Sequence, residues 1–381
     1  MKRASQDPWL LTPGPLTTSL SVKQAMLHDW GSRDEKFIEI NARVRRRLIE
    51  LAGGGDDFVC VPMQGSGTFA VEAAIGTLVP AGAKALILIN GAYGKRMARI
   101  CDYYGRAYET LEWPEDVPND PAAVDERLAA DPTLTHVLGV HCETTSGILN
   151  PVERIARVVA QHQRRYLIDA MSAFGAIELS ARETPFDAVM ASSNKCLEGV
   201  PGMGFVIVRK SLIDECEGNA PSLSLDLYDQ WQAMEANAQW RFTPPVHCIV
   251  AFDQAIQEHE AEGGVAGRGA RYRRNCQVLV EGMRAMGFQT LLPDELQAPI
   301  IVTFHMPADP AFDFKAFYAR LNQRGYVIYP GKLTVADSFR IGCIGRLGEE
   351  QIRGALEAIR TTLEEMGVSR CAPAGAASVA V

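Results

Sequence analysis

Two residues that could do chemistry lie where the chain leaves a short apolar run. Lys195 sits in a polar turn just after the run AVMAS, and Asp169 ends the run YLID. A lysine amine that is removed from water loses its proton more easily, and a neutral amine can form a Schiff base with a carbonyl group. A carboxylate buried without a partner is unfavourable, so Asp169 predicts a cationic partner such as a protonated pyridine nitrogen.

The position of the two residues favours this interpretation over simpler ones. Taken alone, Lys195 fits an exposed loop lysine, because most lysines are surface charges. Asp169 alone fits a residue that caps the turn after it. Both, however, follow strand-length apolar runs, and open parallel sheets bind their ligands beyond the carboxyl ends of the strands. The pair therefore predicts a ligand site at that edge of a sheet.

The segment GSGTFAVEAAIG predicts a site for an anion. Ser66, Gly67 and Thr68 form a turn that leads directly into an alanine-rich helix. The backbone amides, the hydroxyl groups and the helix dipole at such a start all favour a phosphate group. An ordinary capped helix explains the turn equally well. The segment has neither the lysine of a P-loop nor the spacing GxGxxG, so it does not predict a nucleotide site.

Five further residues are candidates for binding a ring or an anion. Tyr93 in NGAYGKR follows an apolar run and could stack on a planar ring, although core packing explains it as well. Thr144 and Thr145 in ETTSG could contact a ring or a substrate, or simply form a turn. Lys332 and Arg340 could meet over one cleft and bind a carboxylate or phosphonate; the alternative is an exposed pair.

The order of the apolar runs predicts the fold class. From about residue 57 to 210, short runs alternate with helical patterns, which predicts an α/β fold with a buried parallel sheet. A helix is predicted to start at Pro151, with Asn150 as its cap and Glu153 reaching back to that cap. The clearest strands are predicted at 85–90, 137–141, 166–169, 188–192 and 205–208.

The pattern changes after about residue 245 and predicts a smaller α+β domain. A helical stretch is interrupted at Gly263 and Gly264, and later runs predict strands, a helix near 315–324 and a closing helix over 348–366. We expect a large domain over 20–250 and a small domain made of 1–19 and 251–368. The alanine-rich tail, 369–381, has too little apolar bulk to order itself and is expected to be disordered.

Composition excludes several functional classes. The chain has 381 residues and a net charge of -8, so it has no overall basic field for nucleic acid. No apolar stretch is long enough to span a membrane and the start lacks a signal-peptide core, which predicts a soluble, cytoplasmic protein. The nine cysteines contain no CxxC pair, so reduced thiols are expected. The seven histidines show no metal-ligand spacing, and no metal is expected.

Together, GSGT, Tyr93, ETTSG, the strand-terminal Asp169 and SSNK with Lys195 resemble the class V aminotransferases of fold type I in order and spacing, over nearly the whole chain. The resemblance implies an α/β fold with a large, mixed, mostly parallel seven-stranded sheet and a smaller α+β C-terminal domain. It implies pyridoxal 5'-phosphate as the cofactor. Lys195 would then carry the Schiff base and move the proton, and Asp169 would face the pyridine nitrogen.

The resemblance also implies the roles of the other candidates. Tyr93 would stack on the cofactor ring, and Arg340 would bind the anionic tail of the substrate. Thr144 and Thr145 beside the cofactor and Lys332 beside Arg340 are expectations from the residues themselves. Since Thr243 of RFTPP would reach the cofactor phosphate from a partner subunit, a homodimer is implied. The residues that would hold or approach the phosphate within one subunit are Ser66, Gly67, Thr68 and Ser192.

Longer stretches narrow the implied substrates. LLTPGPLTTS, HCETTSGILNP, SSNKCLEGVPG and YPGK followed by FRIG resemble the members of the family that convert 2-aminoethylphosphonate and pyruvate to phosphonoacetaldehyde and L-alanine by a ping-pong mechanism. Ser146 and the alanine-rich tail depart from that pattern. Three alternatives stay open: an alanine:glyoxylate or serine:pyruvate transaminase, a cysteine desulfurase that uses Cys343, and a non-catalytic module that binds an anionic metabolite.

Overall fold

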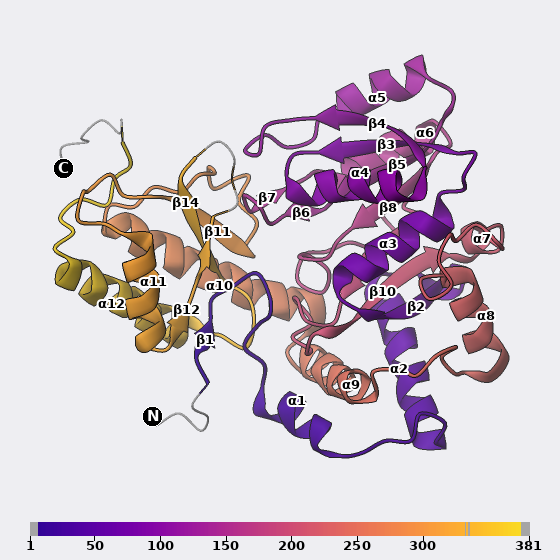
Figure 1. The fold of residues 1–381 in the computed structure, drawn as a ribbon, viewed down its shortest axis with the longest axis horizontal. Helices are drawn as coiled ribbons and strands as arrows, with labels where there is room; N and C mark the ends of the chain where they lie inside the picture. Colours follow the sequence, from indigo (N-terminus) through magenta and orange to yellow (C-terminus); the bar gives the residue numbers. More distant parts are fainter. Residues whose placement is uncertain (1–6, 332, 334–335, 375–381) are drawn as a thin grey trace.

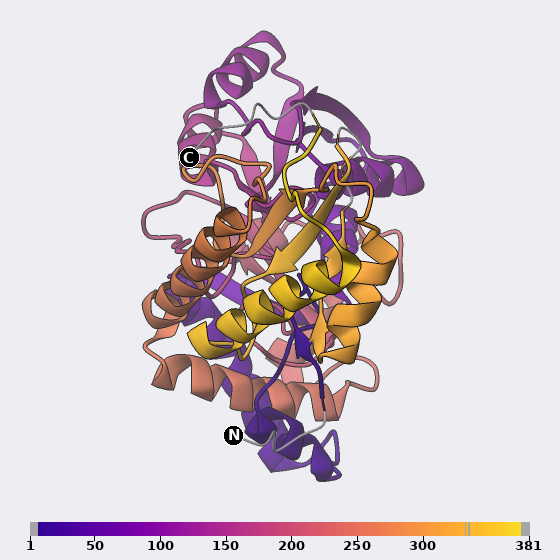
Figure 2. The same ribbon diagram turned by 90° about the vertical axis from the view of Figure 1, so that its left-hand side faces the viewer.

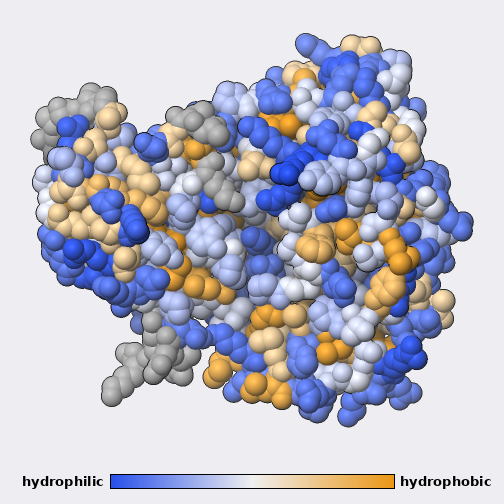
Figure 3. All heavy atoms as spheres, viewed as in Figure 1, coloured by the Kyte–Doolittle hydropathy of each residue, from blue (hydrophilic) through white to orange (hydrophobic). Residues whose placement is uncertain are grey.

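The structure is a computed structural model, and it describes residues 7–331, 333 and 336–374. Figure 1 shows two parts that lie side by side, a larger one built on a seven-stranded sheet and a smaller one built on a three-stranded sheet. Figure 3 shows hydrophilic residues spread over both parts in this view, with smaller apolar patches among them. Among the described residues, no helix is long and apolar enough to cross a membrane.

The large sheet confirms the predicted mostly parallel arrangement. Its strands follow the order β2-β10-β9-β8-β5-β3-β4, and only β10 runs antiparallel to its two neighbours. The strands are β2 (Phe58–Gly65), β3 (Lys84–Ile89), β4 (Ala107–Glu112), β5 (Leu134–Val140), β8 (Arg165–Asp169), β9 (Ala188–Ser192) and β10 (Gly202–Arg209). The five clearest predicted strands match β3, β5, β8, β9 and β10 within a few residues.

Helices cover both faces of this sheet, which is why its central strands are apolar on both sides. Alternate residues of β3 show this, because Leu86 packs into one core cluster and Ile87 into the other. One face carries α2 (Glu35–Leu51), α5 (Pro121–Ala130), α6 (Val152–Gln161) and α9 (Val246–Ala261). The other face carries α3 (Gly67–Leu78), α4 (Ala92–Tyr104), α7 (Lys210–Ile213) and α8 (Leu227–Asn237).

The predicted cap of α6 is wrong. The helix begins at Val152, and Asn150 does not cap it. Instead, the Asn150 side chain donates to the Val140 carbonyl (2.9 Å) and accepts from the Asn90 side chain (2.8 Å) and the Asn119 amide (3.1 Å). Asn150 therefore ties together the segments that follow β3 and β5, and these bonds replace the cap.

The smaller part contains an antiparallel sheet of β11 (Ile301–His305), β14 (Ser338–Gly342) and β13 (Tyr329–Pro330). Figure 2 shows its three helices, α10 (Gly264–Ala285), α11 (Phe314–Gln323) and α12 (Glu349–Met366), on the side that faces the viewer. The N-terminal β1 (Trp9–Leu10) pairs with β12 (Tyr326–Val327). The remaining short elements are α1 (Leu20–Gln24), β6 (Cys142–Glu143), β7 (Ile148–Leu149) and 3₁₀ turns at 25–27 and 55–57. The domain boundaries given above stay a prediction.

The beginning of the C-terminal tail is held against the molecule, unlike the expected disorder from 369 onward. The amides of Ser369 and Arg370 donate to Asp309 at 2.8 and 3.0 Å, and the Ala372 carbonyl accepts from the Ala308 amide at 3.0 Å. Cys371 is buried in the apolar core of the smaller part. The hydrogen bonds to Asp309 hold the start of the tail in place, although this segment has little apolar bulk to bury. Residues 375–381 lie outside the described residues.

Candidate active site

The strand directions bring the candidate residues to one edge of the large sheet. β2, β3, β5, β8 and β9 all run the same way, so their carboxyl ends share that edge. A cavity of about 250 Å³ opens there. Among the residues that line it are seven predicted from the sequence: Ser66, Gly67, Thr68, Tyr93, Asp169, Ser192 and Lys195.

Lys195 reaches into this cavity from the turn after β9. Its ammonium group donates to the Pro13 carbonyl at 2.5 Å. Burial lowers the pKa of Lys195 to about 8, and the positive charges of Arg340 and Arg96 contribute to the shift. An amine with this pKa is partly neutral near neutral pH, as Schiff-base formation requires.

Asp169 is 4% exposed at the end of β8. One carboxylate oxygen accepts from the Met171 amide at 2.9 Å. Burial raises the pKa of Asp169 to about 6. Within the described part of the chain, no basic side chain lies at ion-pair distance from it. A cationic or hydrogen-bond-donating group of a ligand would therefore stabilise the ionised Asp169 carboxylate.

The start of α3 presents hydrogen-bond donors to the same cavity. In the described structure the Ser66 side chain makes no capping bond to the helix and the Phe69 amide donates to the Ser66 carbonyl, so the amides of Gly67 and Thr68 remain available. A Cβ atom on Gly67 would lie only 2.2 Å from the Met171 sulfur, so a larger residue there would require the Met171 side chain to move. The Ser192 hydroxyl is buried and has no hydrogen-bond partner among the described residues. These groups suit a phosphate oxygen.

Tyr93 is placed on the first turn of α4 by the segment after β5. Its amide donates to the Glu143 carboxylate at 3.1 Å, and the Ala92 amide donates to the Thr145 hydroxyl at 3.1 Å. Glu143 is fully buried, and burial raises its pKa. Thr145 therefore holds the start of α4 and does not line the cavity. The sequence alone could not distinguish this structural contact from a contact with a ligand.

Arg340 lies on β14 and meets the same segment. It is 1% exposed, and its guanidinium donates to the carbonyls of Thr144 (2.7 Å) and Pro330 (3.1 Å). Burial lowers the pKa of Arg340. No carboxylate of a described residue pairs with it. Lys332, which was predicted to act beside it, lies outside the described residues.

Thr243 lies elsewhere. It lines a separate hollow of about 380 Å³, together with Arg33, Trp240 and Phe242. Within one chain, therefore, it does not meet the cavity that holds Lys195. A contribution to such a cavity could come only from a second copy of the chain.

Gly14 and Arg96 are among the lining residues that the sequence did not single out. Gly14 has φ +130°, and a Cβ atom there would lie 2.6 Å from the Lys195 nitrogen. Arg96 donates to the Thr68 hydroxyl at 2.9 Å, and its guanidinium lies 4.8 Å from the centre of the Tyr93 ring. The spacing of Tyr93 and Arg96 on one helix face was a usable signal. Gly14 gave none beyond the motif PGP, because its contact with Lys195 is distant in sequence.

Cys343 is not placed for catalysis. It is fully buried, next to the strand that carries Arg340, and does not line the cavity. Its hydrogen bond with the Cys276 thiol and its burial raise the pKa of Cys343 well above the ordinary value. A reactive thiolate needs the opposite shift.

Comparisons with known proteins identify the family of the chain. The family model "Aminotransferase class-V" matches residues 24–336. A 2-aminoethylphosphonate–pyruvate transaminase of Burkholderia lata is 56% identical over 97% of this chain and 99% of its own length. The enzyme of the same name from Pseudomonas putida strain KT2440 is 54% identical over 96% of this chain and 99% of its own.

Solved structures show the same fold. A pyridoxamine-pyruvate aminotransferase from Mesorhizobium loti superposes with a TM-score of 0.86 at 25% identity, over 96% of this chain and 94% of that one. A ureidoglycine-glyoxylate aminotransferase from Bacillus subtilis gives a TM-score of 0.88 at 22% identity, over 98% and 97%. The chain belongs to the class V aminotransferase family.

Proposed function

We propose that this chain is a pyridoxal-phosphate-dependent transaminase that converts 2-aminoethylphosphonate and pyruvate to phosphonoacetaldehyde and L-alanine. The observation that carries the chemistry is the cavity in which Lys195, Asp169 and the turn at the start of α3 come together. The substrate pair rests on relatives that are 52–56% identical over nearly the full chain and bear this activity in their names.

The described residues fit the cofactor at both ends. Asp169 would accept a hydrogen bond from the protonated ring nitrogen, which suits a buried carboxylate whose pKa is raised to about 6. The amides of Gly67 and Thr68 and the Ser192 hydroxyl, which has no partner among the described residues, would hold the phosphate. Tyr93 would cover one face of the ring. When bound, pyridoxal phosphate supplies a reactive carbonyl carbon and a ring that withdraws electrons from the substrate.

Lys195 is the group that moves the proton in this proposal. Its neutral amine would take a proton from the carbon that bears the substrate's amino group and would later return one. The lowered pKa, about 8, allows both steps near neutral pH. Gly14 leaves room beside the amine, and the Pro13 carbonyl orients it.

Arg340 would bind the anionic tail of each substrate in turn. Its planar guanidinium can hold two oxygens of a phosphonate or a carboxylate. Lys332 would add a second positive charge, which a phosphonate dianion needs more than a pyruvate monoanion does. Because the first product would leave the site before pyruvate enters it, with the amino group retained by the enzyme, we expect ping-pong kinetics.

We further propose that the enzyme is a homodimer of the cytoplasm. Thr243 would approach the phosphate bound by a second copy, and two exposed aromatic residues support such a contact. Phe69, next to the phosphate turn, is 47% exposed, and Phe242, next to Thr243, is 45% exposed. All nine cysteines lie in the described part of the chain and are free thiols, which suits a reducing compartment.

The test is a panel of amine donors with pyruvate, in which the product measured is alanine. We expect a strong preference for 2-aminoethylphosphonate over 2-aminoethanol and serine, and parallel initial-rate lines when both substrates are varied. If serine, or alanine with glyoxylate, is used at least as well, the chain is another class V transaminase. Intersecting lines would contradict the ping-pong mechanism.

A further inference from the structure

A largely buried charged cluster that the mechanism above does not use lies next to the turn that carries Lys195. The cluster consists of Glu198 in the turn after Lys195 and of Glu262, Arg268, Arg271 and Tyr272 in or before α10. Arg268 and Tyr272 have no exposed surface, and Glu198 is 3% exposed. Burial of so much charge is unfavourable unless its geometry is tightly defined.

Glu198 fixes the turn from within. Its φ of +57° lies in the left-handed region, which a glutamate adopts only when its surroundings hold it there. Its amide donates to the Lys195 carbonyl at 2.8 Å. One carboxylate oxygen accepts from the Tyr272 hydroxyl (2.6 Å) and from Arg271 (2.7 Å). Arg268 donates to the carbonyl of Cys196, the next residue after Lys195.

The same side chains continue to the strand that carries Arg340. Arg271 donates to the carbonyls of Gly345 (2.6 Å) and Leu347 (2.8 Å), and the Gly345 amide donates to the Tyr272 hydroxyl at 3.1 Å. Gly345 follows closely on the end of β14 at Gly342. Arg271 and Tyr272 therefore touch the Lys195 turn on one side and the segment after Arg340 on the other.

We propose that Glu198 is a positioning residue that sets the distance between the Lys195 amine and the Arg340 guanidinium. Its carboxylate holds the Lys195 turn against Arg271 and Tyr272, which also hold the segment after β14. The two groups belong to different parts of the molecule, and the Glu198 link restrains the Lys195 side, while the bond from Arg340 to the Thr144 carbonyl restrains the other side. A substrate bound by its tail at Arg340 then presents its reacting carbon to Lys195 at one fixed place. The inference rests on the proposed function.

The test compares Glu198→Gln with Glu262→Gln in the purified holoenzyme. Glu262 is a matched control, because it also pairs with Arg268 and Arg271, at 2.8 and 2.6 Å, but touches neither the Lys195 turn nor Gly345 in the described structure. Three quantities are measured: kcat and KM for both substrates, the melting temperature, and the pH midpoint of the visible absorbance of the bound cofactor. The absorbance midpoint reports the surroundings of Lys195 without any substrate.

We expect Glu198→Gln to lower kcat about 10- to 100-fold, since a displacement of about 1 Å can cost a factor of this order. Its absorbance midpoint should move, while that of Glu262→Gln should stay and its kcat should remain within about threefold. Comparable losses of melting temperature in both variants would be compatible with this. Equal losses of kcat, or an unchanged midpoint in Glu198→Gln, would overturn the proposal and leave a structural role.

Tyr272→Phe provides a milder second variant if Glu198→Gln does not fold. It removes only the hydroxyl that joins Glu198 to the Gly345 amide. We expect a smaller loss of kcat with a midpoint shift in the same direction, and an unchanged midpoint would again overturn the proposal. If the wild-type protein does not use 2-aminoethylphosphonate, the absorbance comparison still decides the role of Glu198, so the two proposals fail separately.

Discussion

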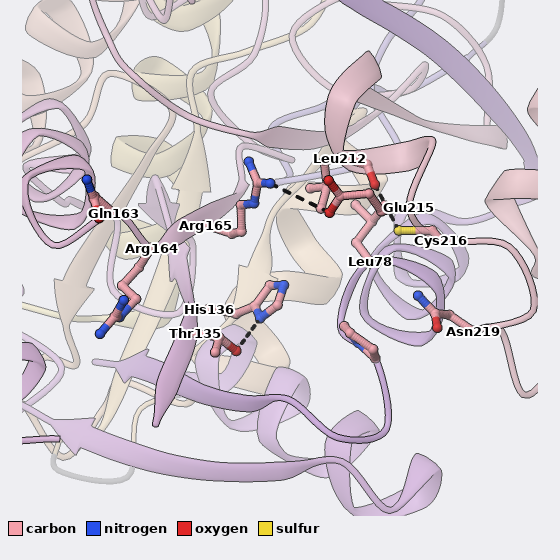
Figure 4. A pocket seen from close by; sticks show the side chains of 11 residues that line it. Leu78, Thr135, His136, Gln163, Arg164, Arg165, Leu212, Glu215, Cys216 and Asn219 are labelled. Atoms are coloured by element: carbon pink, nitrogen blue, oxygen red, sulfur yellow. Dashed lines mark hydrogen bonds and ion pairs between the residues drawn. The ribbon is translucent and has the colours of Figure 1, made fainter. Parts of the chain in front are cut away.

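One cavity lies at the carboxyl ends of the strands of the large sheet and another at their amino ends. The two cavities differ in how their charged groups are paired. At the carboxyl edge, a cavity of about 250 Å³ holds Lys195 and Asp169. At the opposite edge, a cavity of about 220 Å³ is lined by His136 near the start of β5 and Arg165 at the start of β8 (Figure 4). The cavities are similar in size, so size does not identify the site.

Most charged groups of the opposite cavity are paired with neighbours, although the Nε2 of His136 and the Nε of Arg164 have no hydrogen-bond partner among the described residues. Arg165 pairs with Asp187 at 3.1 Å and Glu215 at 3.8 Å, and a ring nitrogen of His136 lies 2.8 Å from the Thr135 hydroxyl. Figure 4 shows Arg165 directed toward Glu215 and His136 toward Thr135. At the carboxyl edge, by contrast, Asp169 has no basic side chain at ion-pair distance and the Ser192 hydroxyl has no hydrogen-bond partner in the described structure.

A shifted pKa does not separate the two edges either. Burial, together with the charge of Arg165, lowers the pKa of His136 to about 4, a shift as large as those of Lys195 and Asp169. What distinguishes the carboxyl edge is that an acid, an amine and helix-start donors converge there from different strands. The comparison teaches that several unpaired groups meeting in one cavity mark the site better than a shifted pKa of a single group does.

The largest effect is expected for Lys195→Ala. Without the amine no Schiff base and no proton transfer from this residue can occur, so transamination should fall below detection and the visible absorbance of the Lys195-bound cofactor should disappear. Absorbance spectra of the purified variant and an alanine assay measure both. A variant that kept the absorbance would mean that another lysine binds the cofactor.

A smaller but still large effect is expected for Asp169→Asn. The neutral amide cannot stabilise a protonated ring nitrogen, so kcat should fall on the order of 100- to 1000-fold, the usual size of a lost electrostatic contact in an active site. Cofactor affinity, measured by titration of the apoenzyme, should fall as well. A variant with near wild-type kcat would remove the main argument for the role of Asp169.

The pH dependence of cofactor capture should follow both carboxyl-edge groups. Because the lowered pKa of Lys195 is about 8, its neutral fraction falls about tenfold per pH unit below 8, and the capture rate should fall with it. Below about pH 6, protonation of Asp169 should add a loss of affinity. Stopped-flow absorbance of apoenzyme mixed with pyridoxal phosphate measures these steps. A rate that rises only near the ordinary lysine pKa of about 10.4 would show that burial does not tune Lys195.

Local patterns predicted much of the fold and the central pair of the site. The run AVMAS is buried throughout as β9; Lys195 follows β9 and Asp169 ends β8, as expected. The edge strand β4 was not singled out, because its residues AYETLE are half exposed and lack an apolar run. The other edge strand, β2, was not singled out either, although its first six residues are buried, so uniform burial alone did not decide which strands were predicted.

Contacts between distant segments could not be predicted in this way. Asn150 was interpreted as a cap because local sequence favours it, but Asn90 and the Val140 carbonyl compete for its side chain. Gly14 meets Lys195 only because the N-terminal segment crosses the cavity. The Glu198 cluster likewise joins residues far apart in the chain, and its members look like surface charges in the sequence.

The smallest effect is expected for His136→Asn, which tests the opposite edge. Since no proposed step uses His136, kcat and KM should stay within about twofold, and loss of its hydrogen bond should lower stability by about 1 kcal/mol. The folded-state pKa of His136 lies near 4, below the ordinary value, so the unfolded chain binds the proton more readily. Wild-type stability should therefore fall as pH drops from about 6.5 to 4, and the variant should lose less over that range. Denaturant unfolding at several pH values measures this difference. A large loss of kcat with unchanged stability would show that the amino-terminal edge takes part in function, and the contrast between the two cavities would no longer hold.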